Sequence, residues 1–236
     1  MTPTRDEHAI DTLPRLEALL GPLSDASVHK ELPYVHPAYR AMIEAQTAAM
    51  TPPPGPPLAH DGPDPVFVVG FPRSGTTLLD TMLMGLPDLC VLEERPVMTE
   101  VLRMLGNADL AALTPQQCGQ LREAYFASAV GHGWDGQRWL VDKHPLNMAR
   151  AVQIHRMFPN ARFIMAERHP ADVVLSCFMA NFTLNFAMRS FTDLEEAALT
   201  YDAVFRAWHR ANDLFPINAH AVRYERLVED SRGELQ

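Results

Sequence analysis

The pattern of apolar and polar residues predicts alternating strands and helices from residue 66 onward. Residues 66–69 are four consecutive apolar residues, mostly β-branched, as is typical of a strand buried on both faces. Apolar residues then recur at helical spacing between Leu78 and Leu86. A loop bounded by Gly70 and Gly75 lies between the two elements. This layout directs several backbone amides and the positive end of a helix dipole at one point, so the sequence predicts a loop that binds phosphate or a similar anion.

Four further short apolar runs predict the remaining strands, at residues 89–92, 139–141, 163–166 and 221–224. Helical patterns separate these runs, and capping boxes at residues 114–117 and 192–195 mark two of the helix starts. Further helices are expected after Pro96, Pro145 and Pro170. Because strand and helix alternate, we expect an α/β fold: a P-loop-containing three-layer sandwich with a central parallel sheet and helices on both faces.

The chain before residue 66 is predicted to be a helical segment followed by a linker. Residues 1–50 predict an accessory helical segment, with one apolar stripe between Leu13 and Leu20 and a second helix from Tyr39 to Met50. Residues 51–65 are crowded with proline, which opposes the interiors of both helices and strands, and we interpret them as a linker. Residues 66–236 then form the core domain.

Composition narrows the class of protein. The 236 residues are 47% hydrophobic and have a formal net charge of -9, which suits one globular domain and argues against nucleic acid as the main partner. The three cysteines have no C-x-x-C spacing, so we expect neither a zinc site nor a disulfide framework. The N-terminus lacks the apolar region of a signal peptide and no run reaches membrane-spanning length, so we expect a cytoplasmic protein with no membrane partner.

The glycine loop differs at one informative position from the P-loop of proteins that bind nucleoside triphosphates. Gly70 and Gly75 have the spacing of the Walker A motif and Thr77 holds its Ser/Thr place, but Thr76 replaces its lysine. Arg73 lies inside the loop instead. Since the missing lysine is the group that contacts the β- and γ-phosphates, ATP is disfavoured, and an arginine fork suits a tetrahedral oxyanion.

The run from Pro72 to Thr77 resembles the 5′-phosphosulfate loop of the sulfotransferases that use 3′-phosphoadenosine 5′-phosphosulfate (PAPS). Its Arg-Ser-Gly-Thr-Thr-Leu version is most similar to that of the protein-tyrosine sulfotransferases and their bacterial relatives. The resemblance implies transfer of a sulfuryl group from PAPS to a hydroxyl or phenol, with no metal expected. It implies that the donor is bound by Arg73, Ser74, Gly75, Thr76 and Thr77.

Polar residues at the expected strand ends resemble the rest of the family's site. Glu94 matches the second glutamate of the family's acid pair, its general base, although the choice between Glu93 and Glu94 stays open. Lys143 resembles the lysine of a Lys-x-Pro element that contacts the bridging or sulfuryl oxygens. Arg168 and Ser176, eight residues apart, resemble the element that binds the 3′-phosphate. We therefore expect Glu94, Lys143 and Arg73 to be catalytic.

The chain departs from the family's pattern at two places. Arg95-Pro96 stands where Thr-Arg often follows the acid pair, which leaves the orientation of the acceptor open. The segment from Tyr224 to Leu227 resembles a Tyr-Glu-Asp-Leu segment, to which we assign a structural role. The family continues with a basic segment past this point, so we expect the core to be truncated at its C-terminus.

The leading prediction is a PAPS-dependent sulfotransferase whose partners are PAPS, its desulfated product PAP, and a small molecule or peptide that carries a hydroxyl. Two alternatives stay open: a P-loop kinase of a small metabolite, which Thr76 in the lysine position opposes, and a catalytically silent P-loop scaffold. A serine hydrolase is excluded, because Pro72 stands where the nucleophile elbow around Ser74 requires glycine. The acceptor and the oligomeric state are not determined by the sequence.

Overall fold

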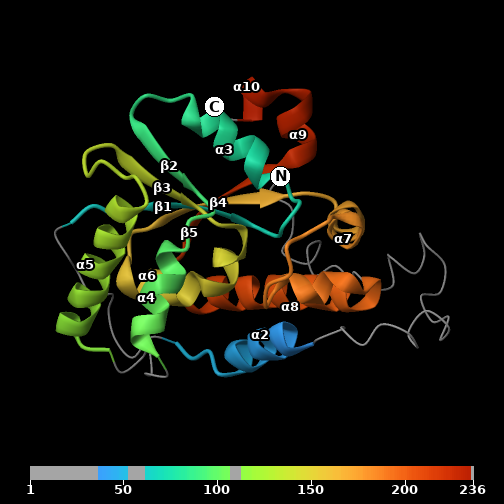
Figure 1. Ribbon diagram of the computed structural model, residues 1–236, viewed down its shortest axis with the longest axis horizontal. Helices are drawn as coiled ribbons and strands as arrows, with labels where there is room; N and C mark the ends of the chain where they lie inside the picture. The colour runs from blue at the N-terminus through green and yellow to red at the C-terminus, as the bar shows by residue number, and fades with distance from the viewer. Residues whose placement is uncertain (1–36, 53–61, 107–112, 235–236) are drawn as a thin grey trace.

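Five parallel strands form the single sheet of the part of the chain described here, which comprises residues 37–52, 62–106 and 113–234 of the computed structural model (Figure 1). Their order across the sheet is β2-β3-β1-β4-β5, and every neighbouring pair is parallel. The strands are β1 (Val66–Gly70), β2 (Leu89–Glu93), β3 (Trp139–Lys143), β4 (Arg162–Glu167) and β5 (Asn218–Arg223). The predicted parallel α/β sheet is confirmed.

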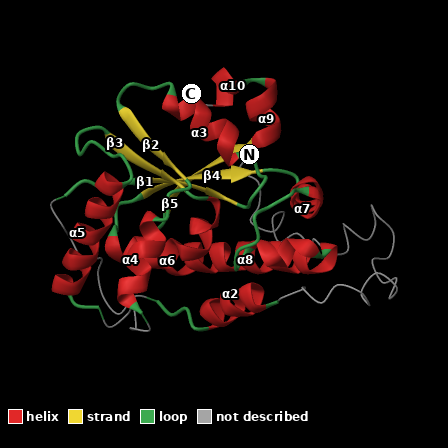
Figure 2. Cartoon of the chain, in the orientation of Figure 1, coloured by secondary structure: helices red, strands yellow, loops and turns green. Residues whose placement is uncertain are grey.

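Helices cover both faces of the sheet, with α3 and α9 on one side and α4, α5, α6 and α8 on the other (Figures 1 and 2). The α-helices are α2 (Ala38–Ala48), α3 (Thr76–Met84), α4 (Val97–Leu105), α5 (Pro115–Gly131), α6 (Ala151–Met157), α7 (Pro170–Met179), α8 (Leu194–Leu214), α9 (Tyr224–Glu229) and α10 (Ser231–Glu234). Two 3-10 segments, η3 (Pro145–Arg150) and η4 (Met188–Thr192), complete the set. None of the helices in the described residues is long and apolar enough to cross a membrane.

Strand β1 is buried on both faces, as its run of apolar residues predicts. Val68 packs with Leu79 of α3 in the smaller core, whereas Phe67 belongs to the larger core on the opposite face. The Phe67 ring is fully buried and lies 5.6 Å from the ring of Phe163 and 6.1 Å from that of Tyr125, between centroids. The loop after β1 therefore starts from a rigidly packed strand, which helps to hold the loop in one place.

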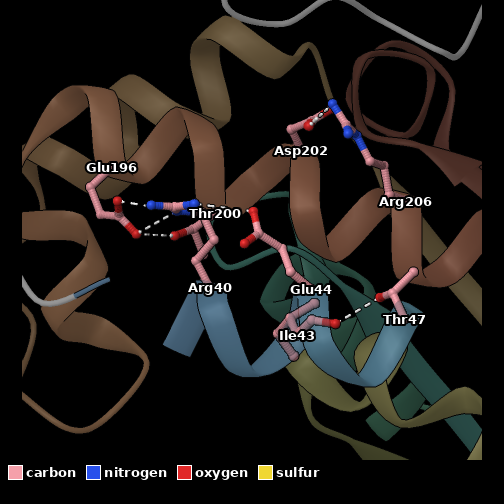
Figure 3. Close-up of polar contacts among 8 residues, drawn as sticks. All are labelled: Arg40, Ile43, Glu44, Thr47, Glu196, Thr200, Asp202 and Arg206. Atoms are coloured by element: carbon pink, nitrogen blue, oxygen red, sulfur yellow. Dashed lines mark hydrogen bonds and ion pairs between the residues drawn. The ribbon is translucent and has the colours of Figure 1, made fainter. Parts of the chain in front are cut away.

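Helix α2 packs along α8, the longest helix of the described chain (Figure 3). Arg40 donates from Nε to both carboxylate oxygens of Glu196, at 3.0 and 3.2 Å. The Glu196 side chain is only 7% exposed and also accepts a hydrogen bond from Thr200. Tyr39 and Ile43 of α2 are buried in the larger core. The helix predicted between residues 39 and 50 thus exists, and it is fastened to the core by an ion pair.

Arg40→Met is expected to lower the free energy of unfolding by about 2 kcal/mol, because it leaves a nearly buried carboxylate without its counter-charge. Methionine keeps an apolar stem of similar length, so the variant isolates the loss of the guanidinium. Urea unfolding of the variant and the parent protein measures the difference.

The matched control is Arg206→Met on α8, also drawn in Figure 3. The Arg206 side chain is 75% exposed and pairs with Asp202 one turn away. An exposed pair of this kind contributes about 0.5 kcal/mol or less. Equal losses in the two variants would show that the pair between α2 and α8 contributes no more than an ordinary surface pair.

Three local predictions need correction. The N-cap of α8 is Asp193, whose Oδ1 accepts from the Glu196 amide at 2.8 Å, and Thr192 instead donates to a carbonyl of the preceding 3-10 turn. Strand β5 begins at Asn218, and Tyr224 starts α9 instead of ending the strand. The segment after residue 144 begins as a 3-10 turn before it becomes α6.

The other local predictions are confirmed, lie outside the described residues or stay predictions. The capping box at Thr114 and Gln117 is confirmed. The apolar stripe between Leu13 and Leu20 lies outside the described residues, as does most of the proline-rich segment. The division into an accessory segment, a linker and a core stays a prediction.

Candidate active site

The predicted site residues follow four neighbouring strands. Arg73 lies in the loop after β1, Glu94 directly follows β2, Lys143 ends β3, and Arg168 directly follows β4. Because all the strands are parallel, their carboxyl ends meet at one edge of the sheet, which is where open α/β sheets bind ligands. The sheet order β2-β3-β1-β4 places these residues side by side along that edge.

The loop after β1 presents backbone amides that have no partner in the part of the chain that the structure describes. The Ser74 amide donates to the Phe71 carbonyl at 3.1 Å. The amides of Gly75, Thr76 and Thr77 have no hydrogen-bond acceptor among the described residues, and no side chain caps the start of α3. Unpaired amides at a helix start, together with the helix dipole, form an anion-binding cradle. The predicted loop therefore has the geometry to bind a phosphate or sulfate group.

Both glycines of the loop are required by close packing. A Cβ on Gly70 would lie 2.8 Å from the Ala166 carbonyl oxygen of β4. Gly75 has a φ of +99°, in the left-handed region, and a Cβ there would collide with the ring of Tyr224 on α9. The cradle is therefore pressed against two elements that lie far from it in the sequence.

Arg73 and Arg168 connect the cradle to α7 and to the residues that precede it. Arg73 donates from Nε to Ser176 Oγ at 3.1 Å, and Arg168 donates from Nη1 to the Arg73 carbonyl at 3.3 Å. The Arg168 guanidinium also lies over the Tyr224 ring, 4.6 Å from its centroid. The two predicted phosphate-binding elements are thus adjacent, and the Arg168 guanidinium contacts the backbone of the loop that carries Arg73.

Lys143 lies at the centre of a cluster of carboxylates. Its side chain is fully buried, and Nζ lies 2.9 Å from Asp80 Oδ2, 2.9 Å from Glu94 Oε1 and 3.2 Å from Glu93 Oε1. Burial by itself would lower the pKa of the Lys143 ammonium, but the hydrogen bond to Glu94 and the ion pair with Asp80 outweigh it and raise that pKa above its usual value. The lysine is therefore held as a cation, able to stabilise developing negative charge.

Glu94 is held in place by its own backbone. Its φ of +49° is in the left-handed region, uncommon for a residue other than glycine, and its amide donates to the Lys143 carbonyl at 2.7 Å. The side chain is 56% exposed although it contacts the buried ammonium. Glu93 is 48% exposed and makes the longer contact, so both glutamates are open to a substrate at the sheet edge.

The two residues that flank Lys143, the half-buried His144 and the fully buried Asp142, have shifted pKa values. Burial, and next the charge of Arg150, lower the pKa of His144 to about 4, so its imidazole is neutral at pH 7. Burial also raises the pKa of Asp142 to about 7, and the Tyr125 hydroxyl donates to that carboxyl group at 2.9 Å. Neither side chain has a place in the predicted site.

Sequence reasoning missed two contributors to this site. Asp80 was not singled out, although a lone carboxylate between Leu79 and Met82 in a predicted buried helix is a signal that it has a partner. Tyr224 was assigned a structural role, and its ring indeed packs on Gly75, but it also supports the Arg168 guanidinium. That second contact has no signal in the local sequence.

Comparison with known proteins gives a family match over most of the chain. A profile described as the sulfotransferase family matches residues 65–236. An uncharacterised protein of Aquifex aeolicus is 28% identical over 222 residues, covering 86% of this chain and 29% of the relative. Protein-tyrosine sulfotransferase 2 of Gallus gallus is 28% identical over 129 residues, covering 50% of this chain and 35% of the relative. Protein-tyrosine sulfotransferase 1 of Homo sapiens is 27% identical over 139 residues, covering 54% of this chain and 38% of the relative.

Solved structures with similar chains include a sulfotransferase from Alicyclobacillus acidocaldarius, with a TM-score of 0.49 and 20% identity over 72% of this chain and 76% of that one. A sulfotransferase domain from the Synechococcus PCC 7002 olefin synthase has a TM-score of 0.46 and 25% identity, over 75% of this chain and 72% of that domain's chain. This chain spans about a third of the length of the curated relatives named above. The family profile, in contrast, matches from the residue before β1 to the last residue of the chain. The chain belongs to the sulfotransferase family.

Proposed function

We propose that the protein moves a sulfuryl group from PAPS to the oxygen of an acceptor hydroxyl or phenol. The observation that carries the proposal is the cradle of amides at Gly75, Thr76 and Thr77, which have no acceptor among the described residues, in a loop whose cation is Arg73 and not a Walker lysine. Membership of the sulfotransferase family supports the same reaction class.

The donor is bound through two anionic groups. The amides of the cradle and Arg73 bind the 5′-phosphosulfate, while Arg168 and Ser176 bind the 3′-phosphate. The hydrogen bond between Arg73 and Ser176 supports this assignment, because it brings the two predicted elements within reach of one nucleotide. In a chain with a net charge of -9, this concentration of guanidinium groups at one edge favours an anionic ligand there.

The transfer itself needs a base and a group that stabilises the leaving oxygen. The acceptor oxygen attacks sulfur, the bond between sulfur and the bridging oxygen breaks, and PAP leaves with the electron pair of that bond. Glu94 accepts the proton of the acceptor hydroxyl, and the Lys143 ammonium stabilises the negative charge that develops on the bridging oxygen. The contact of 2.9 Å between Glu94 Oε1 and Lys143 Nζ supports these two roles, because both groups lie at the same point of the sheet edge.

The first acceptor to test is a phenol. Two of the relatives named above are protein-tyrosine sulfotransferases, and the exposed position of Glu94 would admit a phenolic oxygen from a peptide as well as from a small molecule. Screening tyrosine peptides, small phenols and carbohydrates with labelled PAPS distinguishes these classes.

PAP is expected to stabilise the protein against thermal unfolding more than ATP with magnesium does. At a concentration about 100 times its dissociation constant, PAP would add about 2.7 kcal/mol of stability, a rise in Tm of roughly 5 to 10 °C for a chain of this size. A thermal-shift experiment with both nucleotides measures the difference. Equal protection would favour the P-loop kinase, and no protection by either nucleotide would favour the silent scaffold.

A further inference from the structure

The Lys143 ammonium is surrounded by three carboxylates: it donates hydrogen bonds to Glu93 and Glu94 and forms an ion pair with Asp80. An ammonium carries three N–H donors, and Asp80, Glu94 and Glu93 lie at 2.9, 2.9 and 3.2 Å from Nζ. The proposed reaction requires Lys143 to contact the bridging oxygen of the donor. The N–H groups of Lys143 must therefore be shared between these carboxylates and the donor when the donor binds.

The three carboxylates are not equally free to leave. The side chains of Glu93 and Glu94 are 48% and 56% exposed, so water or substrate can replace the ammonium as their partner. The Asp80 side chain is 1% exposed, and Lys143 is its only ionic partner among the described residues. A buried carboxylate that lost such a partner would be strongly destabilised. Asp80 is therefore the contact that persists through the reaction.

Asp80 also connects the lysine to the phosphate-binding cradle. It lies four residues after Thr76 on α3, so both residues lie on the same face of the helix, and both are buried. The helix whose first amides form the cradle thus carries the anchor of the lysine one turn later. This arrangement sets the separation between the bound 5′-phosphosulfate and the ammonium.

We infer that Asp80 is a positioning residue, which holds Lys143 charged and at a set distance from the cradle while Glu93 and Glu94 exchange the ammonium for substrate. The expected effect of Asp80 on kcat rests on the proposed function. Its expected effect on the charge of Lys143 does not. Burial raises the pKa of Asp80 and its contact with Lys143 opposes that rise, so at neutral pH the two groups support each other's charge.

Asp80→Asn tests the inference by NMR titration of the Lys143 ε-methylene group, assigned by comparison with Lys143→Arg. Removing the buried counter-charge should lower the pKa of Lys143 by about one unit or more. In an active enzyme the alkaline limb of kcat should move to lower pH by the same amount. We also expect kcat to fall about tenfold or more while KM for the acceptor changes less than twofold, because Asp80 does not touch the acceptor.

The matched control is Asp202→Asn, which removes a half-buried carboxylate that pairs with the exposed Arg206 on α8, and it should change neither the pKa of Lys143 nor kcat. An unchanged Lys143 pKa in Asp80→Asn would overturn the inference. A lowered pKa in a protein that shows no PAPS-dependent transfer would support the anchor and refute the proposed function. If Asp80→Asn does not fold, Asp80→Ser, which has a smaller neutral side chain, enters the same titration with the same expected result.

Discussion

Glu94→Gln is expected to lower kcat by about 10²- to 10⁴-fold and to leave PAP binding within a few-fold of the parent protein. Glutamine has nearly the same shape, and its amide oxygen can still accept the hydrogen bond from Lys143. It cannot take the proton of the acceptor hydroxyl, so the loss falls on the chemical step. Initial rates with PAPS and a phenolic acceptor give kcat, and thermal protection by PAP reports donor binding.

Glu93→Gln is the matched comparison, because it makes the same chemical change on the neighbouring residue. Glu94 is held by a strained backbone and by the hydrogen bond that its backbone N–H donates to the Lys143 carbonyl, whereas Glu93 ends β2. We therefore expect the smaller loss of kcat in Glu93→Gln. A larger loss of kcat in Glu93→Gln would assign the base to Glu93. Full activity in both variants would show that neither glutamate is the base.

Gly75→Ala is expected to lower the free energy of unfolding by about 3 kcal/mol and to abolish thermal protection by PAP. Alanine is strained at a φ of +99°, and its methyl group would collide with the Tyr224 ring. Displacement of that ring removes the support of the Arg168 guanidinium, so the donor site is disturbed at both of its proposed phosphate-binding elements. Urea unfolding and PAP titration of the same variant measure the two effects.

Gly119→Ala makes the same substitution where the backbone permits it. Gly119 lies inside α5, and the nearest atom to an added Cβ is the Arg122 side chain at 4.0 Å. Alanine there should stabilise the protein by up to about 1 kcal/mol and leave PAP binding unchanged. Similar effects of the two substitutions would show that neither the left-handed backbone nor the contact with Tyr224 matters for the cradle.

Local sequence predicted the elements whose pattern is complete within a short stretch. The apolar run of β1, the glycine loop and the start of α3 lie within about twenty consecutive residues, and the structure has them where the pattern predicts. The second capping box failed because the preceding 3-10 turn engages the Thr192 hydroxyl, and the cap passes to Asp193. The start of β5 was missed because residues 218–223 are mostly exposed and carry little apolar signal.

The sequence by itself determined the parallel α/β architecture, the anion-binding loop and the polar residues at the strand ends, because these follow from local periodicity and from backbone rules at glycine. Only the tertiary structure decided which of these residues meet. Arg73 reaches Ser176 across 103 residues, Tyr224 closes over Gly75, and Lys143 pairs with Asp80. Such contacts depend on the order of the strands in the sheet and on which helix covers which face, and residues so far apart in the chain leave no periodic signal of their meeting.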